Sequence, residues 1–252
     1  MLKRLTSRKN PVIVHLRKLG TDRAYREERG EFLCDGEKLL REALTWNAEI
    51  TAVVWCGEPQ IQAHCDAQYA ADRDLMDYVS PLKNAASVLF SVRMKQWDAS
   101  AVPGRTLVLE TIQDPGNLGT ILRTANALGI DTVILTGACA DVYNPKTIRA
   151  GMGAVFRQRW LSMDADALRQ YLDQNGLYLC GAALSEESAD IRKIDLTNAA
   201  VAIGSEGKGL SEKMLSLCDK QLIIPMRPQC ESLNAAVAAA IVMWELAKLE
   251  RG

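Results

Sequence analysis

The sequence contains few of the side chains from which proteins build metal sites and hydrolytic triads. Among its 252 residues there are only two histidines, His15 and His64, and seven cysteines, none of them in a C-x-x-C pair. Histidine-based chemistry and a cysteine zinc site are therefore disfavoured, and we predict no bound metal. Because the number of cysteines is odd, a disulfide framework is also disfavoured, and we interpret the cysteines as small buried hydrophobic residues.

Long apolar runs are absent as well. No run approaches the ~18 residues of a membrane helix, and the N-terminus has no apolar core like that of a signal peptide. With 48% hydrophobic and 24% charged residues, the composition is typical of a globular protein and not of a disordered chain. We therefore predict a cytoplasmic protein without a membrane contact, built from one large or two modest domains.

Positive charge is concentrated at the start of an almost neutral chain. The net charge is −1, whereas residues 1–29 hold nine Lys or Arg and three acids, a net +6 that leaves −7 for the remainder. A basic segment on a mildly acidic body is typical of a local contact with a polyanion. A solvated helix face explains the same charges, and composition leaves both interpretations open.

The hydrophobic pattern of the first half predicts a small α/β domain. Strands are expected at residues 31–34, 50–55 and 87–92, and helices at 11–19, 37–46 and 59–71. This alternation indicates a parallel or mixed sheet with helices packed on it. Residues 98–104 are small and end in Pro103 and Gly104, which is typical of a boundary. We therefore divide the chain into a domain at 1–98, a linker at 99–104 and a domain at 105–252.

The second half has a stronger α/β pattern. Strands are expected at 106–109, 132–135, 177–183, 199–203 and 221–224, and helices at 117–128, 145–152, 165–174, 211–217 and 233–250. Several of these strands are apolar throughout, which is typical of a parallel sheet covered on both faces. In such sheets ligands bind beyond the carboxyl ends of the strands.

The first segment that could carry chemistry runs from Asp114 to Gly129. It follows a predicted strand and opens a predicted helix. Asn117 is the predicted helix N-cap, and Pro115 and Gly116 make the turn before it. Arg123 lies off the apolar stripe of this helix and near its start, so it could reach toward the loop. A capped helix with a surface arginine is the structural alternative.

Two further loops follow predicted strands. The segment Gly204-Ser-Glu-Gly-Lys-Gly-Leu210 has three glycines, which allow a ligand to approach the backbone closely. It matches neither a P-loop nor a dinucleotide fingerprint, and a flexible turn is its alternative. In the third loop a proline-bounded segment precedes a helix for which Ser232 is the predicted N-cap, and Asn234 could meet a ligand. The alanine-rich helix that follows could pack closely, including against a second subunit.

Together these loops resemble the SpoU (TrmH-like) class of the SPOUT RNA methyltransferases. Asn117, Gly119, Arg123 and Ala125 resemble its first motif, N-x-G-x-x-x-R-x-A. The glycine-rich segment at 204–210 resembles its second motif, and Ile224-Pro-Met followed by Ser232-Leu-Asn234 resembles its third. Residues 7–37 are similar, more loosely, to the substrate-binding domain of the L30e type that precedes many such enzymes.

The resemblance implies an α/β protein whose C-terminal parallel-sheet domain contains a deep trefoil knot and forms a homodimer. It implies S-adenosylmethionine as cofactor and transfer of its methyl group to a ribose 2′-hydroxyl of RNA, in ribosomal RNA of the 23S type. A transfer RNA target and a resistance-type ribosomal target remain alternatives. A nicotinamide-dependent oxidoreductase is disfavoured, because Gly151-Met-Gly153 is followed by Phe156 where the fingerprint needs glycine.

By position in the motifs, the resemblance also implies which residues act. The implied catalytic residues are Asn117, Arg123, Glu206, Ser232 and Asn234. The implied cofactor contacts are Ala183, Gly204, Ser205, Gly207, Ile224, Leu233 and Met226. The basic residues predicted to bind RNA are Arg8, Lys9, Arg17, Lys18, Arg26, Arg149 and Arg157.

The family assigns the role of base to the arginine that corresponds to Arg123. An arginine guanidinium keeps its proton in proteins, which makes that role chemically awkward. We therefore expect Arg123 to bind the phosphate beside the target ribose and to stabilise the developing alkoxide.

Overall fold

The computed structural model describes residues 2–82, 85–98, 100, 104–185, 188–205, 207–227 and 232–248. By packing, the chain divides into two compact units. The first comprises residues 1–96 and 141–157, and the second comprises residues 97–140 and 158–252. The boundary near residue 97 lies close to the linker expected from the sequence, but the sequence does not predict that residues 141–157 pack with the first unit.

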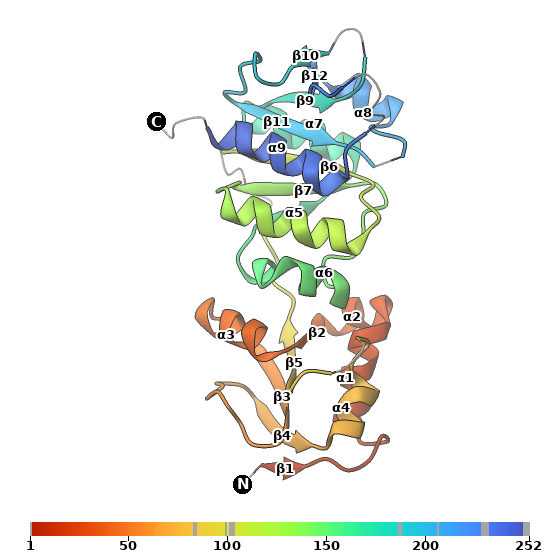
Figure 1. The fold of residues 1–252 in the computed structure, drawn as a ribbon, viewed down its shortest axis with the longest axis vertical. Coiled ribbons are helices and arrows are strands. Elements are labelled where there is room, and N and C mark those ends of the chain that lie inside the picture. The colour runs from red at the N-terminus through yellow and green to blue at the C-terminus, as the bar shows by residue number, and fades with distance from the viewer. Residues whose placement is uncertain are drawn as a thin grey trace. The chain divides into compact units, whose positions relative to one another are not determined.

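The first unit contains a five-stranded mixed sheet in the order β1-β4-β3-β5-β2 (Figure 1). Its strands are β1 (Lys3–Arg4), β2 (Glu31–Asp35), β3 (Ile50–Cys56), β4 (Ala67–Ala71) and β5 (Val88–Arg93). Its helices are α1 (Pro11–Thr21), α2 (Arg23–Arg29), α3 (Glu37–Thr45), α4 (Arg73–Val79), α6 (Pro145–Gly151) and the 3-10 helix η1 (Ala154–Phe156).

Alternation along β2 explains how both faces of this sheet are covered. Leu33 belongs to the core that α1 and α4 build on one face, together with Leu16 and Met76. Phe32, the preceding residue, points to the other face, where its ring lies 4.6 Å from that of Tyr143 and 6.2 Å from that of Phe156. The segment at 141–157 is therefore part of the packing of the first sheet.

The second unit contains a seven-stranded parallel sheet in the order β10-β12-β9-β11-β6-β7-β8. Its strands are β6 (Thr106–Glu110), β7 (Thr132–Thr136), β8 (Trp160–Ser162), β9 (Tyr178–Ala182), β10 (Ala189–Asp190), β11 (Ala199–Ile203) and β12 (Lys220–Ile223). Its helices are α5 (Pro115–Ala127), α7 (Ala165–Gln174), α8 (Glu212–Leu217) and α9 (Ala235–Ala247).

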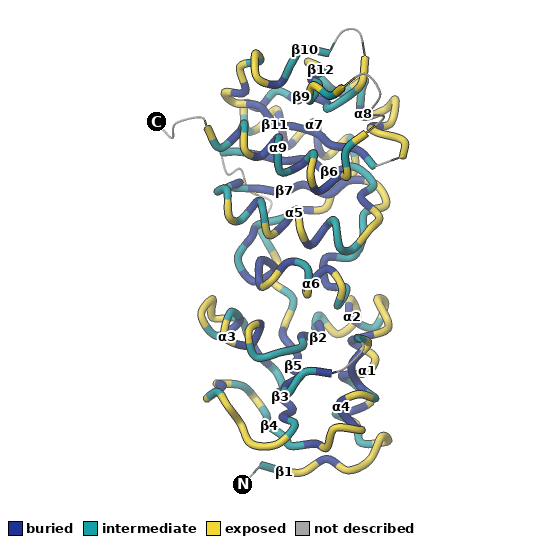
Figure 2. Tube along the Cα trace, viewed as in Figure 1, coloured by how far each residue is buried: buried dark blue, intermediate teal, exposed yellow. Residues whose placement is uncertain are grey.

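Two strands of this sheet, β7 and β11, are buried along their whole length (Figure 2). Val108, Ala200 and Ala202 form one hydrophobic core with Leu168 of α7 and Met214 of α8. The helices α5 and α9 pack against each other, and α9 contacts β11 (Figure 1). Helices on both faces explain why β11 is apolar at every position, as the sequence predicts.

Several predictions about single elements are wrong. The expected helix at 59–71 is absent, and its last five residues form β4, whose backbone pairs with β3 from Ala52↔Ala67 onward. Tertiary pairing therefore overrides the helical pattern of this segment. The helices α2 and α4 were not expected from the sequence. They begin at the N-caps Asp22 and Asp72, whose side chains accept hydrogen bonds from the backbone three residues on.

Among the described residues, no helix is both long and apolar enough to span a membrane. Within the same residues, no group of three or more His, Cys, Asp or Glu side chains is arranged to hold a metal ion.

Candidate active site

A pocket of about 540 Å3 opens in the second unit at the carboxyl ends of three neighbouring strands, β12, β9 and β11. This is the edge at which ligands bind to parallel sheets. All seven residues that the motifs imply as cofactor contacts line it: Ala183, Gly204, Ser205, Gly207, Ile224, Met226 and Leu233. The structure thus brings together residues that lie up to 50 positions apart in the sequence.

The loop after β11 is folded tightly on itself. The amide of Gly209 donates to the carbonyl of Ser205 over 2.9 Å, and the two residues form a short antiparallel bridge. A Cβ atom on Gly204 would lie 2.0 Å from the carbonyl carbon of Gly209. Only glycine fits at Gly204, and the wall of the pocket is consequently made of backbone.

The helix α9, whose first residue Ala235 also lines this pocket, does not begin where the sequence predicts. Its N-cap is Asn234 and not Ser232, because the Asn234 Oδ1 atom accepts from the amides of Ala236 and Val237 over 2.9 and 3.3 Å. The Asn234 Nδ2 atom donates to Oδ1 of Asn117 over 3.1 Å. Ser232 lines the pocket beside Leu233.

The helix α5, in contrast, begins earlier than the sequence predicts. Its N-cap is Asp114, which accepts from the amide of Asn117 over 2.7 Å, and Pro115 occupies the first helical position. Asn117 is therefore inside the first turn, where its side chain is available to meet Asn234. Two residues from the first and third motifs, 117 positions apart, are joined by this bond.

A second pocket of about 520 Å3 lies beside this bond, between the outer faces of α5 and α9. It is lined by Asn117, Thr120, Thr124, Asn234, Ala236, Val237, Ala240, Ile241 and Trp244. The side chains of Val237 and Trp244 are 49% and 56% exposed. Arg123 is exposed on α5 and lines neither of these two pockets. Glu206, the remaining implied catalytic residue, lies outside the described residues.

Sequence reasoning missed two charged residues around the first pocket. Lys208 is the one charged side chain among the described residues that line it. Glu110, the last residue of β6, accepts hydrogen bonds from the backbone amide and the hydroxyl of Ser211, over 2.7 and 2.6 Å. An acid at the end of an otherwise apolar strand is the signal that could have identified Glu110.

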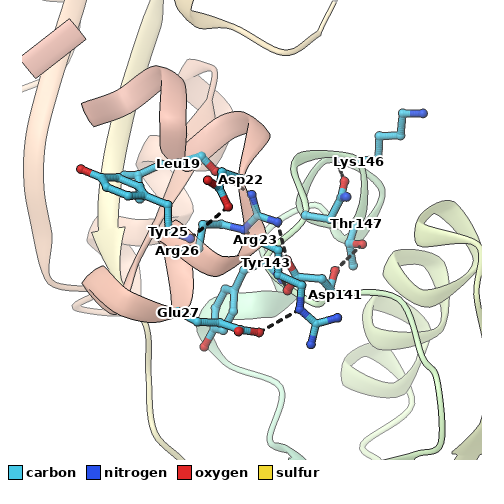
Figure 3. Close-up of polar contacts among 11 residues, drawn as sticks. Leu19, Asp22, Arg23, Tyr25, Arg26, Glu27, Asp141, Tyr143, Lys146 and Thr147 are labelled. Atoms are coloured by element: carbon cyan, nitrogen blue, oxygen red, sulfur yellow. Dashed lines mark hydrogen bonds and ion pairs between the residues drawn. The ribbon is translucent and has the colours of Figure 1, made fainter. Parts of the chain in front are cut away.

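The prediction that Arg26 binds RNA is wrong. Its side chain is 3% exposed, and its guanidinium donates to Asp141 Oδ2 over 2.6 and 3.1 Å and to the carbonyl of Leu19 over 2.8 Å (Figure 3). Each of the three guanidinium nitrogens has a partner within the first unit, and the buried side chain is therefore not placed to meet a phosphate. Helical periodicity places Arg26 on the inner face of α2. A count of the basic residues in the sequence does not distinguish this inner face from the exposed face.

The other predicted RNA-binding residues differ in their surroundings. Arg17 and Arg8 stack on the ring of Tyr78, at 4.0 and 4.5 Å from its centroid, and Lys18 lies 5.0 Å from the ring of Tyr25. Lys9 and Arg149 are exposed. Arg157 is bonded to Glu42 and lies over the ring of Trp46.

Six cysteines are described, and all are free thiols. Cys34 and Cys180 are buried, which confirms the interpretation as small hydrophobic residues for these two, whereas the other four are half-buried. Burial raises the pKa of Cys180 to about 11 and that of Cys218 to about 12. Both thiols are therefore protonated at neutral pH and poor nucleophiles. Cys230 lies outside the described residues.

Comparison with known proteins agrees with this geometry. The model of the SpoU rRNA Methylase family matches residues 104–244. An uncharacterized tRNA/rRNA methyltransferase of Synechocystis is 33% identical, with 96% of this chain and 92% of the relative covered. The 23S rRNA (guanosine(2553)-2′-O)-methyltransferase RlmP of Bacillus subtilis is 30% identical, with 97% of this chain and 99% of the relative covered. A solved structure, an AdoMet-bound rRNA methyltransferase from Sinorhizobium meliloti, is 25% identical and superposes with a TM-score of 0.87, covering 98% of this chain and 97% of that one.

The chain therefore belongs to the SpoU rRNA methylase family. This membership confirms the sequence predictions of the family, of the α/β fold with a parallel sheet and of an RNA methyltransferase that uses S-adenosylmethionine.

Proposed function

We propose that this protein transfers the methyl group of S-adenosylmethionine to a ribose 2′-hydroxyl of ribosomal RNA, of the 23S type. One observation carries the proposal: the seven residues implied as cofactor contacts line a single pocket at the carboxyl ends of β12, β9 and β11. A relative of nearly the same length, RlmP, is named as a 23S rRNA 2′-O-methyltransferase and supports the chosen target.

The residues present fit the cofactor. The pocket volume lies within the ~300–1,000 Å3 of small-molecule sites, and the lining is apolar or backbone apart from Lys208 and two serines. Gly204 and Ser205 would hold the cofactor through backbone groups, while Ile224, Met226 and Leu233 would cover its apolar surface. When bound, S-adenosylmethionine supplies a methyl group on a positively charged sulfur.

The chain's own residues would mainly position the target hydroxyl in line with that methyl group, where effective molarities are large. The Asn117–Asn234 bond would orient the ribose, and Ser232, two residues before Asn234, lines the first pocket. Arg123 would bind the adjoining phosphate and stabilise the alkoxide as the hydroxyl loses its proton. Glu206 would hold Arg123 or the hydroxyl.

Substitution of Arg123 tests this assignment. Arg123→Ala should lower kcat about 100-fold, because a charge-stabilising donor is lost, while the affinity for S-adenosylhomocysteine stays unchanged. Arg192→Ala, which removes another exposed arginine of the same unit, is the control and should retain full turnover. If Arg123→Lys kept near-full activity with a lower pH optimum, the role of base would hold. The proposed role of Arg123 in binding the phosphate and stabilising the alkoxide would then fail.

The target is tested by mapping ribose methylation in ribosomal and transfer RNA from cells with and without the gene. Loss of one 2′-O-methyl group in large-subunit RNA supports the proposal. Loss confined to a transfer RNA would favour the transfer RNA alternative. A methyl group whose loss restores sensitivity to a ribosome-targeting antibiotic would favour the resistance-type alternative.

We also propose that the first unit binds RNA outside the pocket, as an L30e-like domain would. Arg8, Lys9, Arg17, Lys18 and Arg149 supply the charge, and phosphate contacts of this kind weaken steeply with salt. The guanidiniums of Arg8 and Arg17 lie over the ring of Tyr78, which holds the two cations near each other. Arg26 is excluded because it is buried, and Arg157 contributes less because Glu42 holds it.

Finally, we propose a homodimer through the second unit, in which α5 and α9 face a second copy. The exposed Val237 and Trp244 beside the second pocket support this arrangement. The trefoil knot and the cytoplasmic location stay predictions from the sequence and its resemblance.

A further inference from the structure

Glu110 joins two segments that are 101 residues apart. One carboxylate oxygen accepts from the hydroxyl of Ser211 over 2.6 Å, and the other accepts from the Ser211 amide over 2.7 Å. Because both carboxylate oxygens of Glu110 bond to the same residue, the contact is bidentate. It therefore fixes the orientation of Ser211 as well as its distance from Glu110. Bonds of this length to an ionised carboxylate are charge-assisted and stronger than neutral ones.

The Glu110 end of this contact is anchored in the sheet. The strand β6 lies between β11 and β7, so it is paired on both sides. The next residue, Thr111, has a φ of 58°, which is rare for a β-branched residue. Its amide donates to the carbonyl of Thr136 over 3.0 Å, and a Cβ atom on Gly137 would lie 2.6 Å from its hydroxyl. Neighbouring structure therefore holds this turn in place.

The Ser211 end of the contact closes the glycine-rich loop. This loop leaves the sheet after Ile203, which pairs with Leu109, and it ends at Ser211, the N-cap of α8. Its six described residues, Gly204, Ser205, Gly207, Lys208, Gly209 and Leu210, all line the first pocket. The loop therefore begins beside the end of β6 and returns to the carboxylate that ends the same strand.

We propose that Glu110 is a positioning residue of the methyl transfer reaction: it clamps the glycine-rich loop into the shape that receives S-adenosylmethionine. Glu110 does not line the pocket, so it acts through Ser211 and the loop and not through the cofactor. This inference rests on the proposed cofactor pocket. Glycine residues give the loop conformational freedom, and the clamp removes that freedom before binding, which raises affinity by pre-organisation.

The test compares five variants of the full chain by calorimetry with S-adenosylhomocysteine and by amide hydrogen exchange without ligand. Glu110→Ala removes the clamp and should weaken binding at least about tenfold, with faster exchange at Gly209 and Leu210. Glu110→Gln keeps one acceptor and should lie within about threefold of the unsubstituted protein. Glu212→Ala, which removes a neighbouring exposed acid, is the matched control and should bind as the unsubstituted protein does.

A substitution at the partner position separates the clamp from helix capping. Ser211→Asp keeps an N-cap side chain for α8 but sets a second carboxylate against Glu110, so it should weaken binding. In the double variant Glu110→Gln/Ser211→Asp, the side-chain amide introduced at position 110 can donate to the carboxylate introduced at position 211. This variant should recover most of the affinity. Such rescue would not follow from a general loss of fold.

Two results overturn the inference: Glu110→Ala binding within twofold of the unsubstituted protein, or unchanged amide exchange in the loop. A different result challenges the proposed cofactor pocket. If the unsubstituted protein did not bind S-adenosylhomocysteine, the pocket assignment would fail, while the exchange measurement would still decide whether Glu110 holds the loop.

Discussion

At the scale of single residues, the face of α2 that carries an arginine determines whether its side chain is buried or exposed. Arg23 and Arg26 lie three positions apart in α2. Arg23 is exposed and pairs with Glu27 along the helix surface, whereas Arg26 is buried and pairs with Asp141 (Figure 3). The buried pair ties the start of the 141–157 segment to α2, within the first unit.

Removing the two arginines should therefore have very different effects on stability. Arg26→Ala leaves the largely buried Asp141 carboxylate without its cation and should lower the free energy of unfolding by about 3 kcal/mol. Arg23→Ala removes an exposed i,i+4 pair and should cost no more than about 0.5 kcal/mol. Urea unfolding followed by circular dichroism measures both. Similar losses for the two variants would contradict the role assigned to Arg26.

At the scale of elements, the residues at which α5 and α9 begin determine which side chains of the motifs lie close together. Several polar residues suitable as N-caps lie near the start of both α5 and α9. Their sequence pattern indicates Asn117 and Ser232, whereas the structure has Asp114 and Asn234. The difference of a few residues matters, because it places the Asn117 side chain within 3.1 Å of Asn234. Local preference alone does not distinguish between neighbouring caps of similar strength.

The glycine-rich loop gives an element-scale prediction. Gly204→Ala places a methyl group against the backbone of Gly209, which cannot move as a side chain would. The free energy of unfolding should fall by about 1–3 kcal/mol, and affinity for S-adenosylhomocysteine should fall with it. Gly207→Ala, in the same loop, meets no atom within 4 Å and should leave the unfolding free energy unchanged. Equal stability of the two variants in urea would show that the loop is not packed as described.

At the scale of the whole molecule, the outer face of α9 is the part of the described chain that a second copy would cover. Trp244→Glu introduces a charge into the proposed interface and should shift the protein from dimer to monomer in sedimentation velocity experiments at micromolar concentration. Trp46 is exposed to a similar extent, at 50%, and lies in the first unit. Trp46→Glu should leave the dimer intact. A protein that is monomeric without substitution would refute the dimer proposal.

Local sequence patterns were sufficient to predict much of the secondary structure of the second unit. The helix at 165–174 and the strand at 199–203 have the bounds that the sequence predicts. The strands that precede the pocket-lining loops were also predicted, and parallel strands bring the loops that follow them to a common edge. Hydrophobic period, capping chemistry and glycine spacing are properties of neighbouring residues, so the sequence displays them directly.

Other features depend on contacts between distant residues. The pairing of β4 with β3, the burial of Arg26 against Asp141 and the closure of the glycine-rich loop by Glu110 each join segments far apart in the chain. No local preference encodes these partners, since an arginine or a glutamate has the same propensity whether it is buried or solvated. The sequence by itself determined the family and the order of the motifs, because both depend on residues that are close together in the chain. Only the tertiary structure decided which charged residues serve the fold and which are exposed, because that depends on contacts between distant segments.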